Sequence, residues 1–184
     1  MLEIHKSDSL KTLLDATAFA ARAHAGQLRK DGKTPYFSHA FRVCLVIRDV
    51  FGVADHQVLT AAVLHDTVED TTTDFEDLEQ FGSEVAGWVA LLSKDKRLPE
   101  AERERAYVES LSRAPWQVRL CKLADMFDNL MDLASLDAKK RVGVLRRLRD
   151  CLEGITPTGT DETSNAWRMV AELLAAEEGR GRRD

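Results

Sequence analysis

Apolar residues recur at helical spacing along most of the chain. The first such run follows the polar residues 7–9 and ends before Gly26, which stands where a helix C-cap belongs. Its apolar face consists of Leu10, Leu13, Leu14, Thr17, Ala18 and Ala21. We therefore predict a first helix that begins after residues 7–9. Ser38 can cap a second helix, which should end at Gly52.

A third helix, from about Asp55 to His65, is predicted to be the central element of the fold. The residues from Val58 to Leu64 are apolar nearly all round the helix. Helices of this kind are buried on every side, whereas a surface helix has one polar face. We therefore expect the other helices to pack around this one.

Helix start and stop signals continue to the end of the chain. Residues 73–76 have the pattern of a capping box. Pro99 and Pro115 can each start a helix, because the first backbone N–H groups of a helix have no intrahelical acceptor and proline lacks this N–H. The remaining predicted helices run from residue 73 to near 82, from 83 to 92, from Pro99, from Pro115, from 137 to 154 and from 161 to 178.

The predicted fold is all-α. The chain has 184 residues with only 10 glycines and 4 prolines, and no stretch of useful length alternates apolar and polar residues as a strand does. This length fits one compact multi-helix domain over residues 1–184, with its core at about 9–178. Residues 179–184 are expected to form a frayed tail.

Charge and composition exclude several classes of protein. A net charge of −5 argues against a nucleic-acid-coating protein, which needs a basic surface. The longest uncharged apolar stretches, 58–64 and 85–93, are too short to span a membrane. The N-terminus lacks a signal pattern, so we expect a cytoplasmic protein. Three widely spaced cysteines are typical of buried reduced thiols: Cys44, Cys121 and Cys151.

The acidic residues are unevenly distributed. Between Asp49 and Ser93 there are ten acidic residues and no lysine or arginine. Within this stretch, His65 and Asp66 follow the central apolar helix, and Glu69 and Asp70 come next. A His-Asp pair alone is more often a hydrogen-bonded cap than a metal site. Three carboxylates within five residues repel one another unless a cation or a proton intervenes, which favours a bound divalent metal.

A metal site needs ligands from elsewhere in the chain, and His39 and Asp125 are the best candidates. His39 lies at the start of the second predicted helix. Asp125 interrupts an apolar run, where an isolated carboxylate is costly, so it either binds a cation or pairs with Lys122 or an arginine. Two histidines and two aspartates suit Mn²⁺, Fe²⁺ or Zn²⁺ better than Ca²⁺.

These residues stand in motifs that resemble the HD-domain metal-dependent phosphohydrolases, and more specifically the hydrolase domain of the RelA/SpoT alarmone enzymes. The resemblance covers roughly residues 9–150. Within this range, residues 96–103 are similar to the metazoan SpoT homologue. A chain of this length leaves no room for a synthetase domain, so we expect a stand-alone small alarmone hydrolase. The matching segments are 23–30, 35–39, 61–71, 81–86 and 122–125 with Asn129.

The resemblance implies an HD-domain fold and an enzyme that removes the 3′-pyrophosphate of guanosine 3′,5′-bis(diphosphate), ppGpp, giving GDP and pyrophosphate. It implies one Mn²⁺ per chain, or another divalent transition metal, held by His39, His65, Asp66 and Asp125. Glu69 and Asp70 would orient and deprotonate the attacking water. The substrate-binding residues implied are Arg29, Lys30, Tyr36, Lys96 and Asn129. Without the motif, Arg29 and Lys30 would be solvated loop charges.

Three positions depart from the bacterial pattern. Ala40 and Met126 replace a proline and an arginine, and Asp132 stands where a small hydroxyl residue is common. Adenosine alarmones and NADPH therefore stay open as substrates, and so does a different HD phosphohydrolase activity. A non-catalytic nucleotide sensor is a further alternative, which the presence of Glu69 and Asp70 argues against. We expect a small-molecule nucleotide as the partner, with no nucleic acid or membrane, and the sequence does not indicate the oligomeric state.

Overall fold

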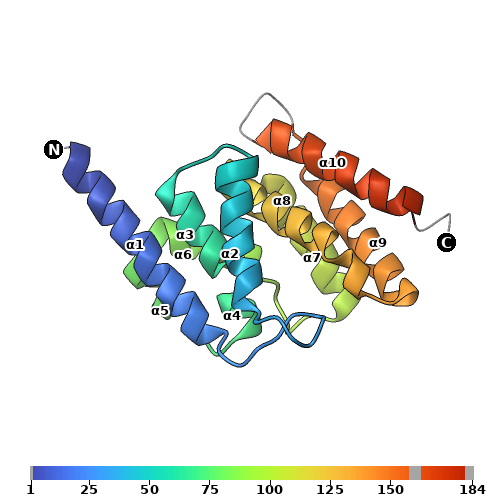
Figure 1. Cartoon of the computed structure of the whole chain (residues 1–184), viewed down its shortest axis with the longest axis horizontal. Coiled ribbons are helices and arrows are strands. Elements are labelled where there is room, and N and C mark those ends of the chain that lie inside the picture. The colour runs from blue at the N-terminus through green and yellow to red at the C-terminus, as the bar shows by residue number, and fades with distance from the viewer. Residues whose placement is uncertain (1, 158–162, 181–184) are drawn as a thin grey trace. The chain divides into compact units, whose positions relative to one another are not determined.

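The computed structural model describes residues 2–157 and 163–180, and these residues are mostly helical (Figure 1). They form no β-strand, and the β-type pairing among them is a single antiparallel bridge between Leu28 and Pro35. The all-α prediction is therefore confirmed. The chain divides into two compact units, Met1–Ser93 and Lys94–Asp184, and each is described by itself. The expected single domain over residues 1–184 stays a prediction.

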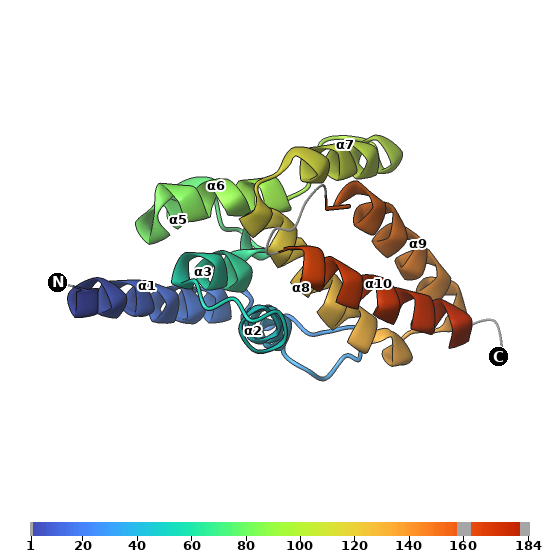
Figure 2. The ribbon, with the colours of Figure 1, turned by 90° about the horizontal axis from the view of Figure 1, so that it is seen from above.

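The first unit is built around α3, which spans His56–Leu64. This helix packs against α1, α2 and α6 (Figure 2), and every residue from Val58 to Leu64 is buried. Asp55 caps it by accepting from the backbone N–H groups of Gln57 and Val58. The predicted central helix is confirmed. The other elements are α1 (Leu2–Ala23), α2 (Phe37–Leu45), the π-helical η1 (Val46–Val50), α4 (Thr67–Asp70), α5 (Phe75–Leu78), the 3₁₀ turn η2 (Glu79–Phe81) and α6 (Ser83–Leu92).

Three predicted helix starts in this unit are wrong. Helix α1 begins at Leu2, so residues 7–9 lie inside it, where polar side chains such as Asp8 face solvent and do not interrupt the helix. Helix α2 begins at Phe37, because the Ser38 backbone N–H already donates to Pro35 O within the preceding turn. The capping box of α5 joins Asp74 and Asp77, one residue later than the predicted 73–76 pair.

The second unit contains α7 (Glu100–Arg113), α8 (Trp116–Met131), the 3₁₀ turn η3 (Leu133–Ser135), α9 (Ala138–Gly154) and α10 (Thr163–Arg180). Helix α8 packs against α10, and α9 packs against α7 and α10 (Figure 2). The predicted helix starts at Pro99, Pro115 and residue 137 are confirmed. Because α10 continues through Arg180, the prediction of a frayed tail from residue 179 is wrong for residues 179 and 180. Residues 181–184 and the predicted start at 161 lie outside the described residues.

A close approach between α7 and α9 depends on Gly154. A Cβ atom at this position would lie 2.6 Å from Val108 Cγ1 and 3.2 Å from the Val108 carbonyl oxygen. Such distances are shorter than van der Waals contact, so a larger residue would push the two helices apart. Glycine at the end of α9 therefore permits the packing of this pair.

The three cysteines are buried free thiols, as predicted: Cys44, Cys121 and Cys151. Burial raises the pKa of Cys44 to about 11 and also raises the pKa of Cys151, because a buried thiolate is poorly solvated. Among the described helices, none combines the length and the apolar character that crossing a membrane requires.

Candidate metal centre and its surroundings

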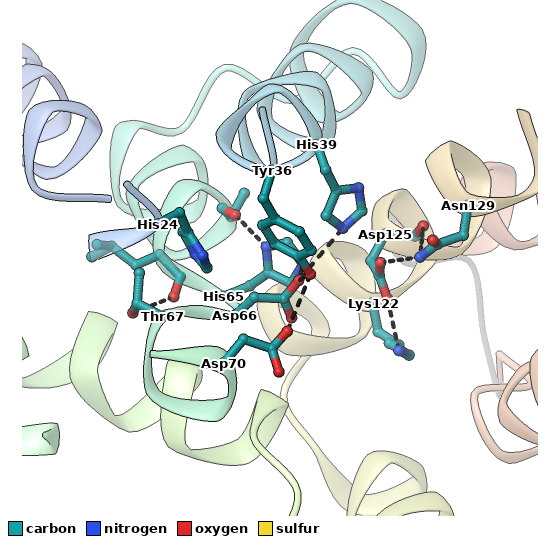
Figure 3. Close-up of polar contacts among 12 residues, drawn as sticks. His24, Tyr36, His39, His65, Asp66, Thr67, Asp70, Lys122, Asp125 and Asn129 are labelled. Atoms are coloured by element: carbon teal, nitrogen blue, oxygen red, sulfur yellow. Dashed lines mark hydrogen bonds and ion pairs between the residues drawn. The ribbon is translucent and has the colours of Figure 1, made fainter. Parts of the chain in front are cut away.

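Two histidines and one aspartate of the first unit converge on one point. His39 lies in the first turn of α2, His65 directly follows α3, and Asp66 is the N-cap residue of α4. Asp66 Oδ2 lies 3.5 Å from His39 Nε2 and 3.0 Å from His65 Nε2 (Figure 3). Ring nitrogens of the two histidines lie within 4.8 Å of each other. Both histidines are buried and the Asp66 side chain is 19% exposed, so the group combines two buried imidazoles with a partly exposed carboxylate.

The tautomer of His65 is set by a backbone contact. His65 Nδ1 lies 2.8 Å from the Ala62 carbonyl oxygen, which can only accept, so Nδ1 carries the proton. In the neutral ring the lone pair is then on Nε2, the atom that faces Asp66. A lone pair and a carboxylate oxygen 3.0 Å apart repel unless a proton or a cation lies between them. This donor set fits a divalent transition metal.

The electrostatics of Asp66 agree with a cation-binding role. Burial alone would raise the pKa of Asp66, but the neighbouring His65 and His39, when their rings carry a proton on Nε2, outweigh burial and hold that pKa well below its ordinary value. The carboxylate is therefore ionised at neutral pH. An ionised carboxylate with two imidazole nitrogens beside it is a His/Asp group that could bind a metal ion.

Tyr36 connects this group to Asp70. The Tyr36 hydroxyl donates to Asp66 Oδ2 at 2.6 Å and lies 3.2 Å from Asp70 Oδ2 (Figure 3). The ring of Tyr36 meets the ring of His39 edge to face, with centroids 5.6 Å apart. Five of the predicted site residues, Tyr36, His39, His65, Asp66 and Asp70, thus lie together in the first unit.

Glu69 and Asp70 are held next to the His/Asp group by the short helix α4. The Asp70 backbone N–H donates to Asp66 O at 2.9 Å, which places Asp70 one turn after Asp66. Thr67 anchors the start of α4, because its hydroxyl donates to Leu64 O at 2.7 Å. Glu69 is half-buried and Asp70 is exposed.

The segment between α1 and α2 is an ordered hairpin-like loop that carries Arg29 and Lys30. The Asp31 carboxylate accepts from the backbone N–H groups of Lys33 and Thr34 and from the Thr34 hydroxyl. These bonds, that of the Thr34 hydroxyl foremost, lower the pKa of Asp31 to about 2. Gly32 adopts a φ of 70°, a left-handed conformation that favours glycine.

Arg29 is not a solvated loop charge. Its side chain is buried, and its guanidinium carbon lies 5.7 Å from the centroid of the Tyr36 ring. Lys30 is exposed, which is compatible with a solvated loop charge and with a phosphate contact. Lys96, in the loop between α6 and α7, is exposed as well. The sequence alone gave no signal for the burial of Arg29.

Asp125 of the second unit is a buried carboxylate on α8 with two partners. Lys122 Nζ lies 2.7 Å from its Oδ2, and Asn129 Nδ2 donates to its Oδ1 at 2.5 Å (Figure 3). The pairing with Lys122 that the sequence left open is therefore present, and Asn129 lies one turn after Asp125 on the same face of α8. Burial would lower the pKa of Lys122, but Asp125, Tyr107 and Cys151 together outweigh burial and hold that pKa well above its ordinary value.

Comparison with known proteins gives the family. The family described as HD domain matches residues 16–151 of the chain. The chain belongs to the HD domain family. It is 46% identical over 127 residues to the guanosine-3′,5′-bis(diphosphate) 3′-pyrophosphohydrolase MESH1 of Danio rerio, covering 68% of this chain and 71% of the relative. The human MESH1 is 45% identical over 123 residues, covering 66% of this chain and 69% of the relative.

Bacterial and structural relatives agree with this membership in the HD domain family. The bifunctional (p)ppGpp synthase/hydrolase SpoT of Escherichia coli K12 is 35% identical over 94% of this chain, which covers 27% of that longer protein. A solved structure of a metazoan SpoT orthologue, described as hydrolysing ppGpp, has a TM-score of 0.78 and 31% identity and covers 88% of this chain and 94% of that one. The HD-domain resemblance and the RelA/SpoT-type assignment are confirmed.

Proposed function

We propose that this HD-domain phosphohydrolase removes the 3′-pyrophosphate of ppGpp, with GDP and pyrophosphate as products. The MESH1 relatives named for this reaction support the substrate. The observation that carries the chemistry is the Asp66 carboxylate, whose Oδ2 faces the Nε2 atoms of His39 and His65 and accepts the hydroxyl of Tyr36. A nucleotide sensor without catalysis would not need Asp70 in contact with the same hydroxyl.

The proposed metal ligands are His39, His65, Asp66 and Asp125, and Mn²⁺ is the proposed ion. The first three supply two neutral imidazoles and an ionised carboxylate, and Asp125 would add a second carboxylate from α8. When bound, the metal lowers the pKa of a water molecule and polarises a phosphoryl oxygen. The two positive charges of the ion would balance the negative charges of Asp66 and Asp125.

Glu69 and Asp70 are proposed as the residues that orient and deprotonate the water. The water oxygen forms a bond to the phosphorus on the 3′ oxygen, the bond between that phosphorus and the 3′ oxygen breaks, and the water proton passes to a carboxylate. The 3′ oxygen takes up a proton, so that the nucleotide leaves as GDP. Asp70 is exposed and linked to Asp66 through Tyr36, a geometry that suits a proton acceptor next to the ligands.

The proposed substrate-binding residues are Arg29, Lys30, Tyr36, Lys96 and Asn129. A guanidinium can stack on a base, and exposed ammonium groups such as Lys30 and Lys96 can neutralise phosphates. The departures Ala40 and Met126 are both buried, so both change packing, and Met126 also removes the cation of the bacterial pattern. The cytoplasmic location and the absence of nucleic-acid or membrane partners stay predictions.

A substrate panel tests the proposal. Mn²⁺-supplemented protein is assayed with ppGpp, the adenosine analogue, NADPH and simple nucleotides, and products are separated by anion exchange. We expect the highest kcat/KM with ppGpp, and a strong preference for NADPH or the adenosine analogue would contradict the proposal. Glu69→Gln should retain metal and fold but lose most turnover, whereas Glu79→Gln, a control at an exposed position, should retain it. Near-normal turnover in Glu69→Gln would refute the role of Glu69.

A further inference from the structure

Gln27 and His24 connect the end of α1 to the helix that carries Asp70. Gln27 Nε2 donates to the Asp70 backbone oxygen at 2.6 Å. His24 Nδ1 lies 2.8 Å from Gln27 Oε1. Because the amide nitrogen of Gln27 faces Asp70, its oxygen faces the histidine, and the ring must donate through Nδ1–H. Two hydrogen bonds therefore run from His24 through Gln27 to the last residue of α4.

His24 also fixes the ring of Tyr36. The two rings are stacked with centroids 4.8 Å apart and an interplanar angle of 29°. The hydroxyl of Tyr36 contacts Oδ2 of Asp66 and of Asp70. One histidine thus supports Asp70 twice: through Gln27 at the backbone carbonyl, and through Tyr36 at the carboxylate.

The burial of His24 agrees with a supporting role. Its side chain is 2% exposed, and Nε2 is buried with no hydrogen-bond partner among the described residues. With the proton on Nδ1, a neutral ring has a lone pair at Nε2, which costs less to bury than the unpartnered N–H of a charged ring. His24 is therefore placed to donate to Gln27 through Nδ1–H.

Helix α4 needs such support because it is short. It consists of four residues, Thr67–Asp70, and Asp70 is its exposed last residue. Helices of this length are not stable by themselves, so contacts from outside decide where the last residue lies. A displacement of about 1 Å at a reacting group can cost on the order of 10²-fold in rate.

We propose that His24 and Gln27 are positioning residues that hold Asp70 where it accepts the proton of the attacking water. This inference rests on the proposed hydrolysis for its kinetic effect. In the proposed reaction, His24 and Gln27 contact neither substrate nor metal. Their loss should therefore lower kcat and leave KM and metal affinity unchanged.

Single and double variants test the connection. His24→Phe keeps a stacking ring and loses the Nδ1 donor, and Gln27→Met keeps the length and loses the amide. We expect each to lower kcat about tenfold, with unchanged KM and unchanged Mn²⁺ affinity in an EPR titration. The double variant should be no slower than either single variant, because both break one chain of contacts. His24→Asn restores a donor and should recover part of the loss relative to His24→Phe.

A matched control removes a similar bond elsewhere. Gln80 Nε2 donates to the Asp77 backbone oxygen at 2.6 Å, so Gln80→Met removes an equivalent bond away from Asp70 and should leave kcat unchanged. An unchanged kcat in Gln27→Met would overturn the proposal. So would a parallel loss of metal binding, or a double variant whose effects multiply.

A second readout uses the metal-free protein and is independent of turnover. The Asp70 and Thr71 backbone N–H groups donate to Asp66 O and Thr67 O within α4. Their hydrogen exchange should be faster in His24→Phe and Gln27→Met than in the wild type and in Gln80→Met. If the wild type does not hydrolyse ppGpp, the proposed function fails, and exchange still decides the inference: faster exchange supports it and unchanged exchange overturns it.

Discussion

Lys122 Nζ lies 2.7 Å from Asp125 Oδ2, and the two side chains are only 14% and 10% exposed. Removal of one partner from a buried ion pair leaves the other charge poorly solvated, at a cost of about 3 kcal/mol. Lys122→Met should therefore lower the free energy of unfolding of the metal-free protein by about this amount, measured by urea denaturation.

The control for this prediction is an exposed pair. Lys11 and Asp15 form an ion pair on α1 with side chains 75% and 57% exposed, so Lys11→Met should have a much smaller effect. If Asp125 is a metal ligand, added Mn²⁺ should raise the free energy of unfolding of Lys122→Met by more than it raises that of the wild type. Equal stability of the two variants would contradict the argument from burial.

Tyr36 is one of the proposed substrate-binding residues, and its hydroxyl is directed at Asp66 and Asp70, which leaves the ring as the part that would contact substrate. Tyr36→Phe removes the hydroxyl and keeps the ring that stacks on His24. We expect kcat to fall about tenfold with little change in KM, since loss of a positioned hydrogen bond costs on the order of 1 kcal/mol or more. Steady-state kinetics check this, and a rise in KM alone would instead place the Tyr36 hydroxyl on the substrate.

The turn that the Asp31 carboxylate holds together should loosen only in strong acid. In the folded protein the pKa of Asp31 is about 2, below its ordinary value of 3.8. The carboxylate therefore stabilises the loop above pH 3.8, and this contribution is lost as the pH falls toward 2. The ¹³C shift of the Asp31 carboxyl carbon should titrate near 2. Asp31→Ala should raise KM several-fold at neutral pH, because the turn positions Arg29 and Lys30. Asp15→Ala on α1 should not, and a carboxyl that titrates near 3.8 would disprove the turn contacts.

Two glycines of α9 should respond to alanine with opposite signs. Gly154→Ala places a methyl group 2.6 Å from Val108 Cγ1 and should destabilise the protein by about 2 kcal/mol. At Gly143 the nearest neighbour of a new Cβ is the flexible Arg147 Nη1 at 3.9 Å, so Gly143→Ala should stabilise by up to about 1 kcal/mol through helix propensity. Thermal unfolding checks both signs, and a stable Gly154→Ala would show that the helices are not so close.

The parts of the fold that could be predicted from the sequence depend on local patterns. Asp55 and the apolar run after it determine α3 directly, because an N-cap and burial on all sides both follow from residue order. The start of α1 could not be predicted, since exposed polar residues such as Asp8 are as compatible with a helix as with its cap. The spacing of apolar and polar side chains does not indicate the π-helical turn Val46–Val50.

The candidate site likewise combines features that local sequence patterns predict with contacts that they do not. The convergence of His39, His65 and Asp66 agrees with the motif, since His65 and Asp66 directly follow α3 and precede α4. The Gln27 bond to Asp70 joins residues 43 positions apart, and it depends on how the loop returns to α4. No local spacing predicts such a contact. The same holds for the burial of Arg29 against Tyr36.

The His/Asp group of His39, His65 and Asp66 should make this chain a metal-dependent ppGpp hydrolase. The most direct measurement is ³¹P NMR of ppGpp incubated with metal-stripped protein, with protein reloaded with Mn²⁺, and with reloaded Asp66→Ala. We predict GDP and pyrophosphate signals with the reloaded wild type and none in the other two samples. Turnover by the metal-stripped protein, or intact ppGpp with the reloaded wild type, would contradict the account.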